Sequence, residues 1–465
     1  MRHLALAIGL GALLAAGAGG AALEHHAAPA ARPSALERAI TPKRLRSHLS
    51  ALQAIARRNG GTRAVGTAGY SQSVAYIARQ LRAVGYKPRL RTFSFRYFRE
   101  TAPPVLERVS PGTRRYAQGP DFIVMRYSGG GNLTALVVPV HLSSSSSGCS
   151  DSDFAGFPRG AIALMKRGGC PFSEKSARAE AAGAAAALMA NDGSPGRTAP
   201  LAATLFTSVT IPAVVVSSDL AAELANLAQI SPVKVHLALS VRTTTARASN
   251  VIAELPGRKS GVVLLGAHLD SVAAGPGIND NGSGSALVLE VAREAKRLHI
   301  RPKHGLRFAW WGGEELGLVG SRSYANGLGA KGRSRILDVL NFDMVGSPNF
   351  GRIVYTAEDA PRGSDRIERA FRAYFASRRL PVEEESLGGA SDHASFAATG
   401  SPVGGLFTGA DETKSASFAN KFGGQAGHSF DACYHKACDT VANIDFRILE
   451  QMADAGAVVA VRLAG

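Results

Sequence analysis

Cysteine is scarce in this sequence, and its placement excludes two kinds of protein. The 465 residues include four cysteines, and none of them precedes Cys149. A lipid-modified cysteine near the start of the chain, as bacterial lipoproteins have, is therefore not available. The cysteines also lack the tight CxxC-like spacing of cysteine-ligated zinc sites, so we do not expect a structural zinc of that kind.

Acidic residues are in deficit, since 36 Asp and Glu face 53 Lys and Arg, which gives a formal net charge of +17. A net positive field attracts nucleic acid, acidic lipid and acidic polymers. The basic residues, however, are mostly arginines scattered among Ala and Gly. They form no dense run and lack the interleaved aromatic residues that nucleic-acid sites use. We therefore expect a basic, solvated surface and no nucleic-acid partner.

Residues 1–22 have the pattern of a signal peptide. Arg2 and His3 are followed by an apolar stretch over 4–16 and by small residues over 17–22. The apolar stretch is short and rich in Ala and Gly for a bilayer core about 30 Å thick, which favours cleavage over an uncleaved anchor. We expect a secreted or periplasmic protein with no stable membrane insertion after signal cleavage.

Export would allow the four cysteines to form disulfides, because an oxidising compartment permits them. They fall into two local pairs, Cys149 with Cys170 and Cys433 with Cys438. Four cysteines allow three connectivities, and the local pairing is the economical one.

The composition, with 45% apolar and 19% charged residues, is that of a globular protein. Apolar residues at helical spacing predict helices over 36–59 and 70–84, and alternation over 88–98 predicts a strand. From about 105 to 239, short apolar runs between Ser and Gly clusters indicate a separate strand-rich insert. Within this insert, the Ala-rich stretch 174–189 predicts a helix.

Beyond residue 250, strands and helices alternate. Apolar runs predict strands over 261–267, 306–311 and 336–342, with a helix over 285–298 between the first two. This alternation predicts an α/β fold with a mostly parallel central sheet flanked by helices. Ligands in such sheets bind at the carboxyl ends of the strands.

Histidine and carboxylate residues gather at those strand ends and in the loops that follow them. Imidazole and carboxylate ligands together suit a catalytic zinc ion. A carboxylate between two such groups can bridge two ions about 3.5 to 4 Å apart. In an adjacent acidic pair, one residue can bind metal while its neighbour acts as a general base. The residues of this pattern are His268, Asp270, Asp280, Glu314, Glu315, Asp343 and His435.

Five segments carry a resemblance to a known family: GAHLDS, GINDNGSG, WWGGEELGLVGS, NFDMVG and CYHKACD, in this order. They resemble the co-catalytic di-zinc aminopeptidases, the family that includes bacterial leucyl aminopeptidases and yeast aminopeptidase Y. The match covers most of residues 37–100 and 245–465. It implies a zinc exopeptidase fold and an enzyme that binds two Zn²⁺ ions.

The resemblance also implies which residues hold the metals. His268 and Asp343 would bind one zinc, Glu315 and His435 would bind the other, and Asp280 would bridge the two ions.

Three further residues acquire roles from the same resemblance. Glu314 would be the general base, and Tyr434 would donate a hydrogen bond to the developing oxyanion. Asp270 would orient the His268 ring without binding the metal itself. A disulfide between Cys433 and Cys438 would restrain the loop that carries Tyr434.

The insert resembles a protease-associated domain, through the segment GCSDSDFAGFPRGAIALMKRGGCPFSEKSARAEAAGAAAALM. Such domains gate or bind substrate and carry no chemistry, although the insert could also be a passive spacer. The expected layout is a signal peptide over 1–22, a first part of the peptidase domain over 37–104, the insert over 105–244, and a second part with the metal site over 245–465.

The expected activity is removal of N-terminal residues from peptides with a free N-terminus, by attack of a zinc-bridged hydroxide. We expect a monomer. A carboxypeptidase or dipeptidase on the same scaffold, or a non-catalytic receptor-like binding protein, is the alternative. A serine hydrolase built on Ser391, Asp392 and His393 is disfavoured, because sequence neighbours cannot form a relay and no G-x-S-x-G elbow is present. That segment is expected to line the substrate pocket or to be structural.

Overall fold

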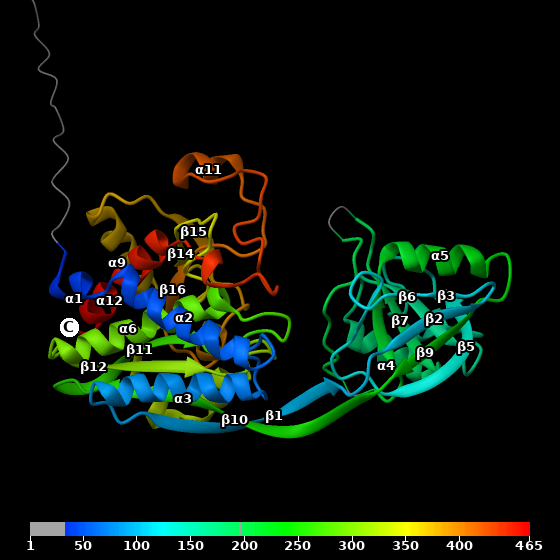
Figure 1. Ribbon diagram of the computed structural model, residues 1–465, viewed down its shortest axis with the longest axis horizontal. Helices are drawn as coiled ribbons and strands as arrows, with labels where there is room; N and C mark the ends of the chain where they lie inside the picture. The colour runs from blue at the N-terminus through cyan, green and yellow to red at the C-terminus, as the bar shows by residue number, and fades with distance from the viewer. Residues whose placement is uncertain (1–32, 195–196, 208) are drawn as a thin grey trace, which may run out of the picture.

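The computed structural model describes residues 33–194, 197–207 and 209–465. The predicted signal peptide lies outside the described residues. Figure 1 shows two lobes, each with its own sheet, joined by the long strands β1 (Arg89–Glu100) and β10 (Val241–Leu255). These two strands pair antiparallel from Arg89 opposite Ile252 to Glu100 opposite Val241, so a continuous two-stranded ribbon links the lobes.

The first sheet has eight strands in the order β1-β10-β12-β11-β13-β16-β14-β15. Its central strands β12, β11, β13 and β16 run parallel to one another, whereas β1 and β10 pair antiparallel with their neighbours. β14 pairs antiparallel with β16 and parallel with β15. The predicted α/β fold with a mostly parallel central sheet is confirmed. The remaining strands are β11 (Lys259–His268), β12 (His304–Trp311), β13 (Ile336–Phe342), β14 (Ile353–Thr356), β15 (Glu383–Ser386) and β16 (Val403–Phe407).

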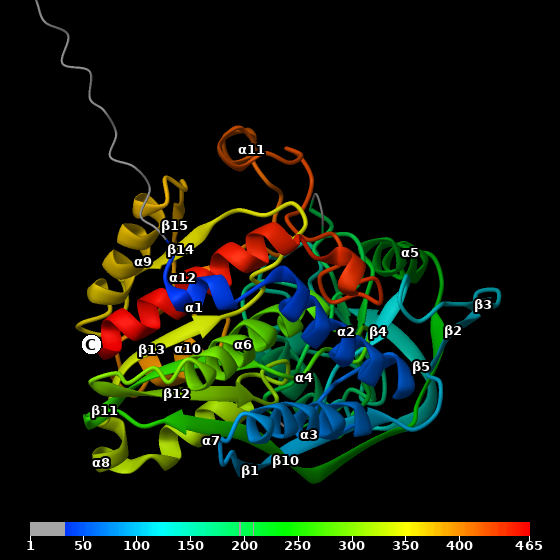
Figure 2. The same cartoon turned by 60° about the vertical axis from the view of Figure 1, so that its left-hand side comes forward.

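Helices cover both faces of this sheet. The larger core lies against α2, α3, α6, α9 and α12, and a smaller core on the other face involves α7 and α10. Figure 2 shows α2, α6 and α12 over the same face of the sheet. The helices are α1 (Ala35–Ala39), α2 (Pro42–Arg58), α3 (Ala68–Ala83), α6 (Gly284–Arg297), α7 (Val319–Gly327), α8 (Gly329–Arg333), α9 (Asp365–Ser377), α10 (His393–Ala397), α11 (Ala416–Phe422) and α12 (Phe446–Ala464).

The first predicted helix is interrupted at its beginning. Residues 36–59 form α1 and then α2, because the Thr41 side chain caps a new helix that starts at Pro42. Leu45, Leu49 and Leu52 then bury one face of α2.

The second sheet belongs to the inserted lobe and has the order β3-β2-β9-β5-β6-β7-β8-β4. Strands β5, β6, β7 and β8 run parallel, and two apolar cores lie against the sheet. Its elements are β2 (Val105–Ser110), β3 (Arg114–Arg115), β4 (Phe122–Val124), β5 (Gly131–Pro139), β6 (Ile162–Lys166), α4 (Phe172–Ala181), β7 (Ala186–Ala190), β8 (Ala213–Val216), α5 (Ser218–Ala228) and β9 (Lys234–Leu239).

Two details of the insert differ from or sharpen the sequence prediction. The helix predicted over 174–189 is wrong in its second part, because α4 ends at Ala181 and β7 continues as a fully buried strand. Gly183, at φ +86°, makes the turn between them. The predicted boundary between residues 244 and 245 falls inside the continuous strand β10, and the domain limits stay a prediction.

Both predicted local disulfides are present, Cys149–Cys170 in the insert and Cys433–Cys438 in the first lobe. A search of the described helices finds none that combines the length and the apolar character needed to cross a bilayer.

Candidate active site

The candidate site lies at the carboxyl edge of the parallel strands. β11 ends at His268, β12 is followed by Glu314 and Glu315, and β13 is followed directly by Asp343. Because these three strands are parallel neighbours, their ends meet at one edge of the sheet.

Two loops bring the remaining residues to this edge. Asp280 lies in the buried segment Ile278–Ser283, directly before α6, at a kink where its backbone angles are not helical. His435 comes from the distant loop that the Cys433–Cys438 disulfide closes. The local sequence alone gives no reason for His435 to meet β11, so the fold creates this contact.

Asp280 stands between the two histidines. Its Oδ1 lies 3.1 Å from His268 Nε2, and its Oδ2 lies 3.0 Å from His435 Nε2. On the first side, His268 Nε2 is also 3.3 Å from Asp343 Oδ1. On the second side, His435 Nε2 is 3.2 Å from Glu315 Oε2. Two groups of three potential ligand atoms therefore share one carboxylate.

These residues fit zinc by geometry. Ligand atoms bound about 2.0 to 2.1 Å from a tetrahedral ion lie roughly 3.3 to 3.4 Å from each other, close to the nitrogen–oxygen separations found here. In addition, Glu315 Oε1 and Asp343 Oδ1 are buried and make no hydrogen bond within the described part of the chain. Buried acceptors without a donor are costly unless a cation satisfies them.

The electrostatics of the metal-free chain also favour a cation. Burial raises the pKa of Glu315 to about 7, and the neighbouring Asp280 carboxylate adds to the rise. Burial lowers the pKa of His435, but its contacts with Asp280 and Glu315 outweigh burial and raise that pKa to about 10. The carboxylates thus repel one another and favour protonated imidazoles. Divalent cations would take the place of these protons and offset the repulsion between the carboxylates.

Asp270 lies beside the ligand groups, and Glu314 forms a third group of potential ligand atoms with His268 and Glu315. The backbone N–H of Glu314 donates to Asp270 Oδ1 over 3.3 Å. His268 Nδ1 is 3.2 Å from the backbone oxygen of Asp270 and 3.7 Å from its Oδ1, so Asp270 faces the ring nitrogen that points away from Asp280. Burial raises the pKa of Glu314 well above its ordinary value, against the attraction of a charged His268.

Tyr434 stacks on His435, with ring centroids 3.8 Å apart and an interplanar angle of 22°. Burial and the nearby Asp280 carboxylate raise the pKa of the Tyr434 phenol. The phenol therefore keeps its proton and remains a hydrogen-bond donor at neutral pH.

The segment Ser391–His393 has no catalytic relay. Ser391 Oγ donates to Asp343 Oδ2 over 2.6 Å, and His393 Nε2 lies 2.9 Å from the backbone oxygen of Leu387. Ser391 therefore supports the candidate ligand Asp343, and His393 is a buried structural residue.

Sequence reasoning missed Asp439, which fixes the backbone around Asp280. Its buried carboxylate accepts the N–H groups of Asn279 over 2.7 Å and of Asp280 over 3.1 Å. The signal was available, because Asp439 closes the segment CYHKACD.

Arg63 was missed as well. It is fully buried, and Nε donates to the backbone oxygen of Pro276 over 2.8 Å, while the other guanidinium nitrogens donate to those of Leu269 and Gly277. One side chain from the loop before α3 thus fixes the backbone segment that joins His268 to Asp280. Only the segment GGTRAVGTAGY pointed to it, and that segment was interpreted as the opening helices.

The inserted lobe reaches the site through Arg126. Its Nη1 donates to the backbone oxygen of Glu315 over 2.9 Å. The backbone of Arg126 is itself fixed by Ala203 and Leu205 of the same lobe, through hydrogen bonds of 2.8 and 3.0 Å. A candidate metal ligand is therefore contacted from the insert.

Comparisons with known proteins agree with this geometry. The sequence pattern of peptidase family M28 matches residues 250–460, and that of the PA domain matches residues 133–224. An aminopeptidase of Pseudomonas aeruginosa is 41% identical over 443 residues, which cover 92% of this chain and 82% of the relative.

Solved structures give the same result for the fold. The aminopeptidase from Aneurinibacillus sp. strain AM-1 superposes with a TM-score of 0.73 at 27% identity, covering 92% of this chain and 95% of that chain. BSAP, a zinc aminopeptidase from Bacillus subtilis, gives a TM-score of 0.70 at 25% identity, covering 91% and 94%. The chain therefore belongs to peptidase family M28 and is an aminopeptidase with an inserted PA domain.

Proposed function

We propose that this aminopeptidase depends on two zinc ions and works outside the cytoplasm. The observation that carries the proposal is the position of Asp280, whose two carboxylate oxygens face His268 and His435 separately. In the proposed site, His268, Asp343 and Asp280 would hold one zinc, and Asp280, Glu315 and His435 would hold the other.

Catalysis is divided between the metals and three side chains. Zinc would supply Lewis-acid chemistry, polarising the peptide carbonyl and easing deprotonation of water. Glu314 would take the proton of the attacking water and return it to the leaving amine. Tyr434 donates to the developing oxyanion, and Asp270 keeps the His268 ring in orientation.

Substrate and location are part of the same proposal. The substrates are peptides with a free N-terminus, as the aminopeptidase relatives indicate. The two disulfides accord with an oxidising compartment, and we infer a secreted or periplasmic monomer from which residues 1–22 have been removed. The proposed peptidase domain comprises 37–104 and 245–465, with 105–244 as the insert.

The test uses a short leucine-initiated peptide with a free or an acetylated N-terminus, together with the zinc content per chain measured by plasma mass spectrometry. Two zinc ions per chain, loss of hydrolysis on chelation, recovery with zinc and rejection of the acetylated peptide are the expected results. Trimming of both peptides from the carboxyl end would replace the proposal with a carboxypeptidase. A failure of the zinc-loaded protein to cut either peptide would support the receptor-like alternative.

A further inference from the structure

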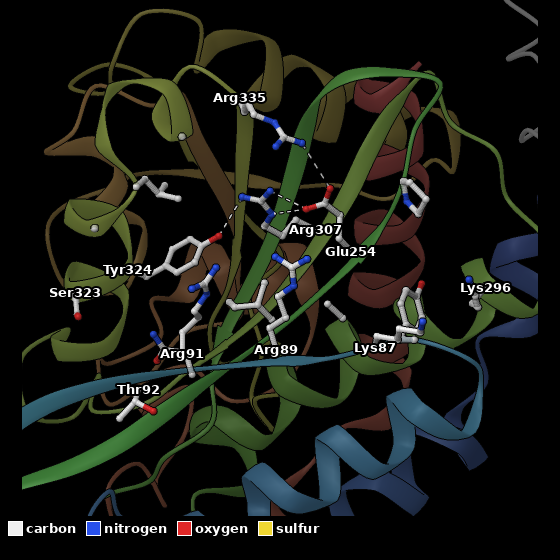
Figure 3. A pocket seen from close by; sticks show the side chains of 18 of the residues that line it. Lys87, Arg89, Arg91, Thr92, Glu254, Lys296, Arg307, Ser323, Tyr324 and Arg335 are labelled. Carbon is white, nitrogen blue, oxygen red and sulfur yellow. Dashed lines mark hydrogen bonds and ion pairs between the residues drawn. The ribbon is translucent and has the colours of Figure 1, made fainter.

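A second concave site lies on the first lobe, away from the candidate metal ligands. A cavity of about 760 Å³ opens between the start of β1, the strands β10 and β12, and the helices α7 and α8. None of the proposed ligands or catalytic residues lines it. Figure 3 shows its interior.

The lining of this cavity is strongly basic. A single carboxylate, that of Glu254, faces the cationic side chains of Lys87, Arg89, Arg91, Lys296, Arg307 and Arg335. The formal charge of the chain makes basic surface common, but here the cations converge on one hollow.

The only carboxylate is already engaged. Arg307 donates to Glu254 Oε2 through Nε over 2.9 Å and through Nη2 over 2.7 Å, and its Nη1 donates to Tyr324 Oη over 3.0 Å. Arg335 lies 3.8 Å from the second oxygen of Glu254. The floor of the cavity is therefore a fixed Arg307–Glu254 pair with no negative charge left for other cations.

Arg89 and Arg91 have no ion-pair partner in the described part of the chain, and neither has Lys87. Figure 3 shows the two arginines pointing from β1 into the cavity, toward Arg307 and Tyr324. They are two residues apart on one strand, so their backbones are roughly 7 Å apart on the same face. Two guanidinium groups so placed can each bind one anionic group through paired hydrogen bonds.

We propose that this cavity binds a small ligand with at least two anionic oxygen groups, carried as phosphates, sulfates or carboxylates. Arg89 and Arg91 contact the two groups, while Lys87 adds positive potential. The site is independent of peptide hydrolysis and goes beyond the proposed function.

The test measures binding of pyrenetetrasulfonate, a fluorescent tetra-anion with little affinity for zinc, by fluorescence anisotropy at about 0.15 M salt. We expect saturable binding to the zinc-loaded protein and a loss of affinity of about tenfold or more in R89Q/R91Q, because two charge-assisted contacts are removed. The matched control is R99Q/R242Q, which removes the same charge from exposed, directly opposed residues of the β1–β10 ribbon outside the cavity. The control should keep its affinity within about twofold.

Equal weakening by the two double variants would overturn the proposal in favour of a general surface field, and so would a failure to saturate. Hydrolysis of the leucine-initiated peptide checks that each variant is folded, and R91Q alone, expected to show an intermediate loss, replaces the double variant if that one does not fold. Fructose bisphosphate and glutarate then compete with the probe, and the more effective competitor identifies phosphate or carboxylate chemistry. Displacement by neither would show that the pyrene ring binds, which also overturns the proposal.

Discussion

The two sheets of this chain have similar architecture, but their strand ends differ. Each sheet has eight strands with parallel neighbours at its centre. In the peptidase lobe, β11 ends at His268, and β12 and β13 are followed by Glu314 and Asp343. All the groups of potential metal ligands found among the described residues lie at this edge.

In the inserted lobe, polar residues at the strand ends satisfy one another. Arg167 follows β6 and donates to Asn191 Oδ1, after β7, over 3.2 Å. Ser217, after β8, accepts the N–H of Leu220 and caps α5. By contrast, oxygens of Glu315 and Asp343 stay without a donor. Parallel strands thus bring loops together in both lobes, and a surplus of buried acceptors at the strand ends of one lobe then suits a cation.

Asp280→Ala should have the largest effect. It removes the carboxylate shared by two of the three groups of potential ligands, those of the two proposed zinc positions, so metal binding fails at both. We expect kcat/KM to fall about ten-thousandfold or more and the zinc content to fall with it. The matched control is Asp192→Ala, which removes a carboxylate at a strand end of the insert and should leave both quantities unchanged. Full activity of the Asp280 variant would contradict the proposal that the strand ends of the peptidase lobe bind metal while those of the insert do not.

Glu314→Gln should separate chemistry from metal binding. The variant keeps the volume and the two ligand groups that share Asp280 but loses the proton acceptor, so we expect kcat to fall about a thousandfold while zinc content and KM change little. Glu315→Gln removes a ligand instead and should lower the zinc content. If Glu314→Gln loses zinc and Glu315→Gln does not, the two roles are exchanged.

The sequence predicted the peptidase sheet better than the insert, for a physical reason. Strand β11 has a continuous apolar run that ends at His268, and β12 and β13 are mostly apolar and are soon followed by Glu314 and Asp343, so both the type and the end of these strands could be recognised. The stretch 174–189 is rich in alanine, which fits a helix and a fully buried strand equally well. Tertiary burial of β7 decides between them, and no local pattern records it.

The candidate site was predicted in its residue types but not in its support. The ligand-type residues follow strands and are conspicuous in sequence, while the shared position of Asp280 rested on the family resemblance. Arg63 and Asp439 act on the backbone of residues more than 150 positions away in the chain. Such contacts depend on the completed fold, so periodicity and composition could not predict them.

The two disulfides give a third way to test the comparison. Replacing Cys433 and Cys438 by Ser frees the loop of His435, so zinc affinity at the Glu315/His435 position should fall, by roughly the tenfold typical of lost ligand support. Replacing Cys149 and Cys170 by Ser should destabilise the insert by about 3 kcal/mol and leave the zinc content unchanged. Zinc titration against a competing chelator and thermal unfolding measure the two effects. Unchanged zinc affinity in the Cys433/Cys438 variant would contradict a role for that disulfide.

Arg126→Gln should have the smallest effect. It tests whether the insert contributes to hydrolysis at the site of the peptidase lobe. Arg126 is the contact through which the insert holds the backbone oxygen of Glu315. A half-buried hydrogen bond of this kind contributes about 1 kcal/mol, so we expect kcat/KM to fall about fivefold with the zinc content unchanged. The matched control, Arg115→Gln, removes an exposed arginine of the same lobe and should change nothing. The bond goes to the backbone oxygen of Glu315, so a loss confined to kcat would mean that the insert aligns Glu315. A loss confined to KM would mean that Arg126 acts on the substrate instead.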